Sequence, residues 1–174
     1  MSVEVLASLG EREVAELSDV LIDCVEGGAS VSFMHPLSRK KAERFWRSSS
    51  DSVDRGERIV IGAKDADGVI VGTLSVIFAV PENQPHRADL AKMLVHRRAR
   101  NAGVGAALLQ AAEEAARAAG RWLLVLDTVT DSAAARLYVR HGWRRCGEIP
   151  NYALWPDGRL CPTTFYYKEL RQAR

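Results

Sequence analysis

The stretch from Met93 to Gly120 constrains this chain most, because it places a glycine-rich turn between an apolar strand and an amphipathic helix. Met93-Leu94-Val95 ends the strand, and Gly103-Val104-Gly105 opens the helix after a short basic loop. Apolar residues then recur at helical spacing, so the helix buries one face and should leave Glu113 mainly on the other. Gly120 is a natural stop, because glycine readily takes the left-handed conformation after a last helical turn.

Such a strand-to-helix turn is suited to bind an anion. The first N–H groups of a helix lack partners within it, and the helix dipole places partial positive charge at that end. Gly103 and Gly105 let a ligand approach the backbone, and Arg97, Arg98 and Arg100 come just before them. The turn therefore predicts a phosphate or pyrophosphate site. The alternative is a tight turn in which the glycines serve only backbone geometry.

Two common phosphate-binding motifs fit this turn less well. A P-loop needs a Lys after its last glycine, and none follows Gly105. The dinucleotide fingerprint matches at Gly103 and Gly105, with Asp127 ending the next strand, but Leu108 occupies the third small position. A doubly wound sheet also needs more strands than the rest of the chain provides. A Rossmann-like nucleotide-binding enzyme, either an oxidoreductase or a methyltransferase, remains an alternative.

The segment from Val95 to Leu109 resembles the acyl-CoA-binding signature of the GNAT N-acetyltransferases, V-x-P-x-x-R-G-x-G-x-G-x-x-L-L. Arg97 stands where the family usually has Pro, and Asn101 where it has Gly, a position that Asn tolerates because it enters the left-handed region readily. The resemblance implies that acetyl-CoA is the cosubstrate and that backbone N–H groups of Asn101–Ala106 hold its pyrophosphate. The matching residues are Val95, Arg100, Gly103, Gly105, Leu108 and Leu109.

A second stretch, Ala134 to Trp143, resembles the other GNAT signature, N-x-x-A-x-x-[LF]-Y-x-x-x-G-[FW]. Asp131 takes the place of the family Asn. The family tyrosine lies near the CoA sulfur and can protonate the leaving thiolate, so the resemblance implies that role for Tyr138. The alternative for Tyr138 is a buried core residue. The two signatures together imply a GNAT fold with a twisted, splayed central sheet.

Asp89 is a candidate general base. It lies on the strand predicted over His86–Val95, where side chains alternate between the two faces. Among apolar neighbours its carboxyl would be desolvated, which raises its pKa and favours proton acceptance. The alternative is an ion pair with Arg87 at a frayed strand end. The expected neighbours on its face are Ala91, Met93 and Val95.

Asp127 is a second candidate, because it ends the apolar strand Leu123–Leu126, and catalytic groups often lie at the carboxyl ends of such strands. A turn or capping role is the alternative, although Asp131 is better placed to cap the next helix. HRADLAKMLV and the residues from Gly147 to Leu170 resemble the tabtoxin-resistance acetyltransferase branch. In that branch, two acidic residues at the positions of Asp89 and Asp127 are proposed bases.

The resemblance implies direct transfer of an acetyl group to a primary amine of a small amino-acid-like, antibiotic-like or toxin-like acceptor, through a ternary complex. The pantetheine would lie along Met93–Val95, and a backbone N–H near Leu94 would bind the developing oxyanion. A catalytically silent acyl-CoA-binding protein is an alternative. Acceptor-binding candidates, each alternatively a packing residue, are Phe33, His35, Tyr152 and Trp155. The cofactor-binding set is Met93, Leu94, Val95, Arg100, Asn101, Ala102, Gly103, Val104, Gly105, Ala106 and Asp131.

Composition narrows the partners. The chain has 174 residues, 47% apolar and 26% charged, which is enough for one domain with a sizeable core. A net charge of +2 demands no nucleic acid, and no apolar run is long enough to span a membrane. The three cysteines and four histidines show no metal-ligand spacing, so no metal is expected. We expect a cytoplasmic protein, monomeric or homodimeric, without a signal peptide.

Hydrophobic periodicity predicts a mixed α/β chain of order β-α-α-β-β-β-α-β-α-β-β, with about seven strands and about four helices in one domain. The second helix should end near Ser49, before a polar connection over residues 48–52. The predicted ranges outside the glycine turn are strands at 2–7, 58–63, 69–80, 86–95, 121–127, 143–149 and 162–168, and helices at 9–24, 38–49 and 131–141.

Overall fold

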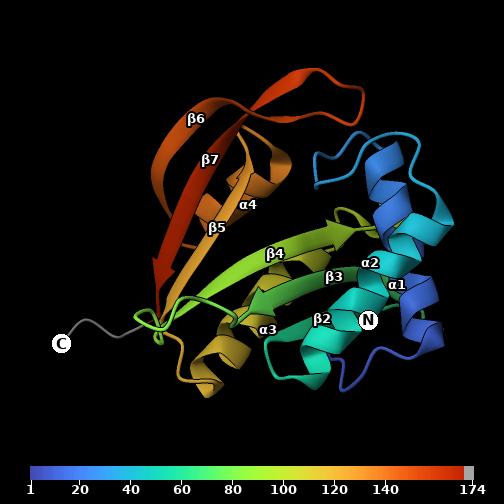
Figure 1. The fold of residues 1–174 in the computed structure, drawn as a ribbon, viewed down its shortest axis with the longest axis horizontal. Coiled ribbons are helices and arrows are strands. Elements are labelled where there is room, and N and C mark those ends of the chain that lie inside the picture. Colours follow the sequence, from blue (N-terminus) through green and yellow to red (C-terminus); the bar gives the residue numbers. More distant parts are fainter. Residues whose placement is uncertain (171–174) are drawn as a thin grey trace.

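The computed structural model describes residues 1–170, whose strands form a seven-stranded sheet in the order β1-β2-β3-β4-β5-β7-β6 (Figure 1). The element order is the one predicted from the sequence, in a mixed α/β fold. The strands are β1 (Ser2–Val5), β2 (Arg58–Lys64), β3 (Ile70–Ile77), β4 (Arg87–Val95), β5 (Leu123–Val129), β6 (Arg144–Leu154) and β7 (Leu160–Glu169). The helices are α1 (Glu11–Glu26), α2 (Arg39–Asp54), α3 (Val104–Ala118) and α4 (Ala133–Arg140), with a 3-10 turn at Arg97–Ala99.

The pairing directions exclude a Rossmann-like sheet. Neighbouring strands are antiparallel throughout the described part of the chain, except β4 and β5. A doubly wound nucleotide-binding sheet is built mainly from parallel strands. The nucleotide-binding alternative that the glycine turn left open is therefore wrong for this chain.

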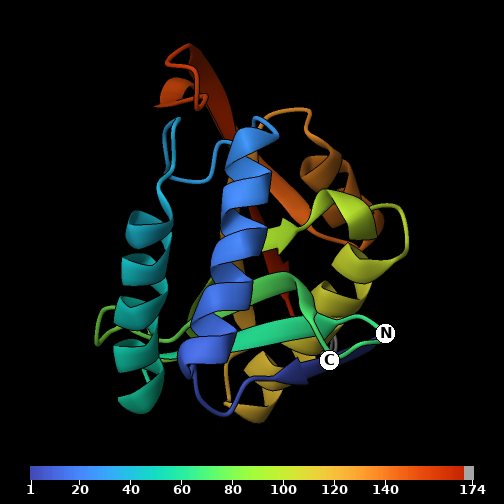
Figure 2. The ribbon, with the colours of Figure 1, turned by 90° about the vertical axis from the view of Figure 1, so that its right-hand side faces the viewer.

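Helices cover both faces of the sheet, so that two cores form (Figure 2). α1 and α2 pack on one face, where Leu17, Leu21 and Trp46 are fully buried. α3 and α4 pack on the other, around Leu108 and Tyr138. Each fully buried side chain of this size contributes roughly 1.5–3 kcal/mol. The two cores fix the sheet between the helices and so hold the ends of β4 and β5 in place.

α2 and β6 extend further than predicted. α2 runs to Asp54, through the serines that were expected to form a polar connection. Ser49 donates to the Phe45 carbonyl at 3.0 Å and Ser50 to the Leu9 carbonyl at 3.3 Å, so these hydroxyls find partners without ending the helix. β6 continues to Leu154 because it pairs with β7 across two register irregularities.

Two predictions about polar side chains are wrong. Glu113 is 7% exposed rather than solvent-facing, and it accepts hydrogen bonds from Lys168 Nζ at 2.7 Å and Trp143 Nε1 at 3.3 Å. These partners offset the cost of burying its charge. Ser132, not Asp131, caps α4: its Oγ accepts from the Ala135 N–H at 3.0 Å, and Asp131 precedes it with φ of 58°.

Candidate active site

β4 and β5 pair only where they begin. Their parallel register covers three pairs, Arg87–Leu123, Ala88–Leu124 and Asp89–Val125. Beyond Asp89 the strands diverge, β4 continuing beside β3 and β5 beside β7 (Figure 1). In the described structure, the edge of β4 that faces β5 therefore has no strand partner along Met93–Val95. Free N–H and C=O groups on such an edge can pair with an extended ligand.

A bulge in β4 changes which side chains share a face. The β3–β4 register passes from Thr73–Leu94 to Ser75–Ala91, which inserts one extra residue in β4, and Lys92 there has φ of 54°. Side chains beyond the bulge switch faces, so Met93 and Val95 pack against the α3–α4 core, as Leu90 does. The prediction that Asp89 shares a face with Met93 and Val95 is therefore wrong. A bulge cannot be read from alternation alone, because it breaks the alternation.

Tyr138 lies where α4 approaches the end of β4. Its ring is 5% exposed, and its hydroxyl donates to Met93 Sδ at 3.6 Å. Burial raises the pKa of the Tyr138 phenol, and the negative charge of Asp127 raises it further. Tyr138 therefore remains protonated at neutral pH. The structure places a protonated hydroxyl beside the Met93 side chain at the end of β4, a position compatible with a thiolate-protonating role.

Asp89 has both features that were considered as alternatives from the sequence, a carboxyl with a raised pKa and an ion pair with Arg87. Burial raises the pKa of its carboxyl, while the charge of Arg87 lowers it, and the net shift is upward. The Arg87 guanidinium also donates to Asp89 Oδ2 at 3.0 Å. The ion pair and a proton-accepting role are therefore compatible, because the carboxyl still binds a proton more readily than an ordinary aspartate.

Asp127 lies on β5, two residues past Val125, the register partner of Asp89, so both aspartates belong to the same face. Although Asp127 is an exposed residue, protein atoms packed around its carboxyl raise its pKa. The nearby Lys92 charge opposes that shift, and the Asp89 charge adds weakly to it. Asp127 is thus electrostatically linked to both Lys92 and Asp89.

The glycine turn has the backbone features that a CoA pyrophosphate needs. Gly103 caps α3 with φ of 78°, no side chain caps the helix N-terminus, and a Cβ built on Gly103 would meet no atom within 4 Å. Asn101 has φ of 61°, the left-handed conformation that its side chain tolerates. Asn101 to Gly103 are exposed, so the residues present fit a phosphate group approaching the helix N-terminus. Gly105 differs, because its Cβ would lie 3.1 Å from Leu137 Cδ2. Gly105 therefore also permits α3 and α4 to pack closely.

The loop before the turn is held by residues that sequence reasoning missed. Asp23 on α1 is 7% exposed and accepts from the Arg97 backbone N–H at 2.8 Å and from Arg97 Nε at 2.6 Å. Arg100 donates to the Val95 carbonyl at 3.1 Å and lies 3.9 Å from Cys24 Sγ. Arg100 thus connects the loop to the end of β4, and its predicted contact with CoA stays a prediction.

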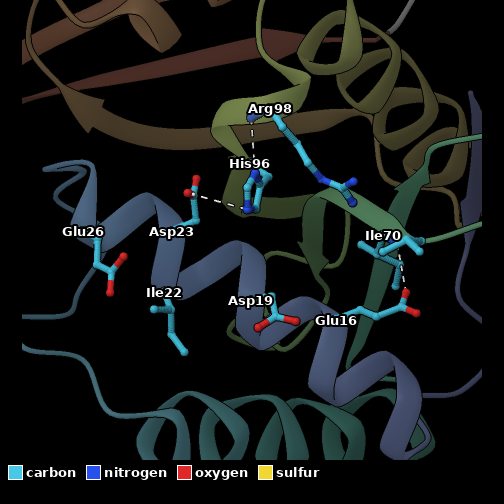
Figure 3. A pocket seen from close by; sticks show the side chains of 9 residues that line it. Glu16, Asp19, Ile22, Asp23, Glu26, Ile70, His96 and Arg98 are labelled. Atoms are coloured by element: carbon cyan, nitrogen blue, oxygen red, sulfur yellow. Dashed lines mark hydrogen bonds and ion pairs between the residues drawn. The ribbon is translucent and has the colours of Figure 1, made fainter.

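A pocket of ≈ 330 Å³ lies between α1 and the loop that carries His96 and Arg98 (Figure 3). Carboxylates of α1 form one wall, and His96 and Arg98 of the loop form the opposite wall, with Asp23 directed toward His96. None of the predicted catalytic side chains lines it. Its acidic wall would repel the phosphates of CoA. The carboxylates are those of Glu16, Asp19, Asp23 and Glu26.

Two basic residues near the aspartates were also missed. Lys92 Nζ lies 3.2 Å from Ser32 Oγ and 5.6 Å from the centre of the Phe45 ring. Arg58 donates from Nη1 to Ser49 Oγ at 3.1 Å. The available signal for Lys92 was a single charge within the otherwise apolar run LAKMLV.

The predicted acceptor-binding residues occupy two segments that touch. The His35 backbone N–H donates to the Pro156 carbonyl at 3.1 Å, which joins the α1–α2 loop to the β6–β7 hairpin. Tyr152 is 51% exposed, and Trp155 lies at the hairpin tip. Phe33 is 8% exposed and packs edge-on against Phe45, so it belongs to the core.

Neither a metal cluster nor a membrane helix is found in the described part of the chain. Residues 1–170 contain no group of three or more His, Cys, Asp or Glu side chains able to hold a metal ion. Within the same residues, no helix is long and apolar enough to cross a membrane.

Comparisons with known proteins agree with this geometry. The family model described as Acetyltransferase (GNAT) family matches residues 22–143. An uncharacterised N-acetyltransferase from the hisH-hisA intergenic region of Azospirillum brasilense is 32% identical over 129 residues, covering 73% of this chain and 74% of that protein.

Solved structures show the same fold. A ribosomal-protein-alanine N-acetyltransferase from Brucella melitensis has a TM-score of 0.80 at 22% identity, over 98% of this chain and 100% of that chain. The Salmonella typhimurium protein yncA, solved with its cofactor acetyl-CoA, has a TM-score of 0.80 at 17% identity, over 100% of this chain and 96% of that chain. The match to the family model and the relative from Azospirillum brasilense establish that this chain belongs to the GNAT family of N-acetyltransferases, whose cosubstrate is acetyl-CoA.

Proposed function

We propose that this protein transfers an acetyl group directly to the primary amine of a small, amino-acid-like acceptor, within a ternary complex. The observation that carries the proposal is the arrangement around the divergent strands. A buried, protonated Tyr138 lies on one side of the end of β4, and two carboxyls with raised pKa values, Asp89 and Asp127, lie on the opposite face.

Different groups of the chain bind acetyl-CoA, orient it and stabilise the charge that develops during transfer. Backbone N–H groups of Asn101–Ala106 bind the pyrophosphate, and the free edge at Met93–Val95 aligns the pantetheine. Acetyl-CoA, when bound, supplies the acetyl group and a thiolate as the leaving group. A backbone N–H near Leu94 stabilises negative charge on the carbonyl oxygen. Holding both reactants together removes much of the entropic barrier, so no covalent enzyme intermediate is required.

Proton transfers to and from side chains complete the reaction. Most primary amines are protonated at neutral pH, and an ammonium group cannot attack. Asp127 or Asp89, directly or through a water, accepts that proton, and the raised pKa of each carboxyl matches the task. The Tyr138 hydroxyl then donates its proton to the departing sulfur, while the nitrogen releases its second proton to water as the amide forms, and water returns a proton to the Tyr138 phenolate. Asp131, at the position of the family Asn, is the proposed additional contact to CoA from the start of α4.

Two measurements test the proposal. CoA and acetyl-CoA should raise the melting temperature, whereas NAD and S-adenosylmethionine should not. Incubation with acetyl-CoA and a panel of amino acids, polyamines, aminoglycosides and peptides should release free thiol with at least one small amino-acid-like amine. Tight CoA binding with thiol release no faster than hydrolysis would identify a non-catalytic acyl-CoA-binding protein. Selective turnover of peptides would place the acceptor at a protein N-terminus.

A further inference from the structure

We propose that Lys92 and Arg58 form a subsite for a carboxylate of the acceptor, so that the acceptor is a zwitterionic amino acid rather than a simple amine. This inference rests on the proposed function and specifies its acceptor. It comes from the position, contacts and charge of these two side chains on the face that carries Asp89 and Asp127.

Strand register places Arg58 in the same row as the aspartates. Arg58 is opposite Ile77, Ile77 is opposite Asp89, and Asp89 is beside Val125, so these residues project from the same face of the sheet. Asp127 follows two residues after Val125, on that face. A cation and two candidate bases therefore line one side of the sheet, below α2 and the α1–α2 loop.

The bulge brings Lys92 to the same region. Its ammonium reaches over the Phe45 ring to Ser32 in the α1–α2 loop, the loop that also carries His35. Without the extra residue in β4, alternation would not direct Lys92 toward α2 and that loop. A non-glycine residue held at φ of 54° is uncommon, which is consistent with a functional requirement at this position.

Both cations lack a close counter-ion. Within residues 1–170, neither Lys92 nor Arg58 forms an ion pair within 4.0 Å. Arg58 Nε is buried without a hydrogen-bond partner in the described structure. A buried donor left unpaired is costly, so such groups usually meet a partner in the functional state. A carboxylate accepts several hydrogen bonds and would supply one.

The local charges favour one added negative charge. Arg87 is paired with Asp89 at 3.0 Å, which leaves Asp127 as the carboxylate that interacts with Lys92. Burial lowers the pKa of Lys92, and repulsion from Arg58 lowers it further, while Asp127 opposes the shift. A bound carboxylate would relieve this repulsion. The acceptor ammonium would meanwhile face Asp127 or Asp89.

Matched substrates test the subsite. Free L-amino acids and their α-carboxamides both carry a primary α-amine, but only the acids carry the negative charge of a carboxylate. We expect wild-type kcat/KM to favour the acids by about tenfold or more, as for a charged hydrogen-bonded group. Lys92→Gln and Arg58→Gln should reduce that preference mainly through KM, Lys92→Arg should retain part of it, and Lys40→Gln on the exposed surface of α2 should leave it unchanged.

Each outcome of these measurements either supports the subsite or overturns it. Equal or better use of carboxamides by the wild type would overturn the subsite. An unchanged preference for acids over carboxamides in Lys92→Gln would also overturn it, because Lys92 would then contribute nothing to recognition of the carboxylate. If no amine is acetylated while acetyl-CoA binds, the proposed function fails separately. In that case the subsite is tested by ligand-induced stabilisation. N-acetyl amino acids should stabilise the wild type more than their carboxamides do, and Lys92→Gln should lose this difference. If the wild type shows no such difference, the subsite is overturned.

Discussion

Asp23 binds Arg97 twice, through the backbone N–H at 2.8 Å and through Nε at 2.6 Å. This pair connects α1 to the loop that leads into the glycine turn. Arg97 occupies the position where the family usually has a proline, so the loop lacks that source of stiffness. A side-chain clamp from a neighbouring helix can take over that function, because it fixes both the backbone and the side chain of Arg97.

Asp23→Asn should therefore weaken acetyl-CoA binding severalfold and destabilise the protein by about 1–2 kcal/mol, because the carboxylate is nearly buried while the Arg97 side chain is about half exposed to solvent. Isothermal titration calorimetry and chemical denaturation measure the two effects. Glu26→Gln is the matched control, because Glu26 lies 3.8 Å from the same Arg97 but is 57% exposed. Equal effects of the two substitutions would show that Asp23 does not act as a clamp.

The difference in the free energy of unfolding between the wild type and Asp23→Asn should also depend on pH. Burial alone would raise the pKa of Asp23, but hydrogen bonds from Arg97 and the charges of His96 and Arg97 hold it below the usual range. A lowered pKa in the folded state means that the stabilisation is complete above the unfolded-state value of about 3.9 and disappears as pH falls through the folded-state value. Denaturation of wild type and Asp23→Asn at neutral pH and below pH ~4 should show the gap closing.

Gly103 and Gly105 should respond differently to substitution. Gly103→Val places a side chain at φ of 78° in open space beside the helix N-terminus, so it should lower acetyl-CoA affinity at a strain cost of about 1–2 kcal/mol. Gly105→Val meets Leu137 at the α3–α4 contact and should reduce the melting temperature more, in addition to any loss of affinity. Unchanged CoA affinity in a folded Gly103→Val protein would contradict the proposed pyrophosphate site.

Tyr138→Phe should lower kcat by about tenfold or more, with little change in acetyl-CoA affinity. General acid–base catalysis typically contributes a factor of about 10²–10⁴ to the rate. The hydroxyl donates to Met93 Sδ, and in the proposed mechanism it is needed only as the thiolate leaves. Rapid-mix measurement of the chemical step separates it from product release. A chemical rate within about twofold of wild type would make Tyr138 a packing residue.

The sequence allowed the order of elements and the glycine turn to be predicted, because both depend on local patterns. Hydrophobic periodicity reports burial of a strand or helix face, and the glycine spacing reports backbone conformation. Gly103 and Asn101 both have positive φ in the structure, as their residue types suggested. These features require no knowledge of distant parts of the chain.

Contacts between distant segments could not be predicted in the same way. Glu113 has the charge of a surface residue, and only the arrival of Lys168 from β7 makes its burial favourable. Lys92 reaches Ser32 and Phe45 because a bulge in β4 redirects the strand, and the alternation of side chains gives no sign of that bulge. The Asp23–Arg97 pair likewise joins residues that are remote in sequence.

The last prediction concerns Asp89 and Asp127, the two candidate bases. Asp89→Asn and Asp127→Asn should each lower kcat/KM at neutral pH, by about tenfold or more for the residue that accepts the proton. The double variant should lose less than the product of the single effects, since groups that act together are not additive. Raising the pH should partly rescue each single variant, because more of the acceptor amine is then already neutral.

The pH profile should move in opposite directions in two variants. Activity falls as the base becomes protonated, so a raised pKa places the acidic limb of the profile closer to neutrality. Lys92 lowers the pKa of Asp127 and Asp89 raises it slightly. If Asp127 is the base, Lys92→Gln should move the limb of kcat/KM to higher pH, and Asp89→Asn should move it to lower pH. Profiles measured with one acceptor for the wild type and both variants decide the assignment. Limbs that coincide in all three proteins would show that the acceptor amine itself, and not Asp127, determines the pH dependence.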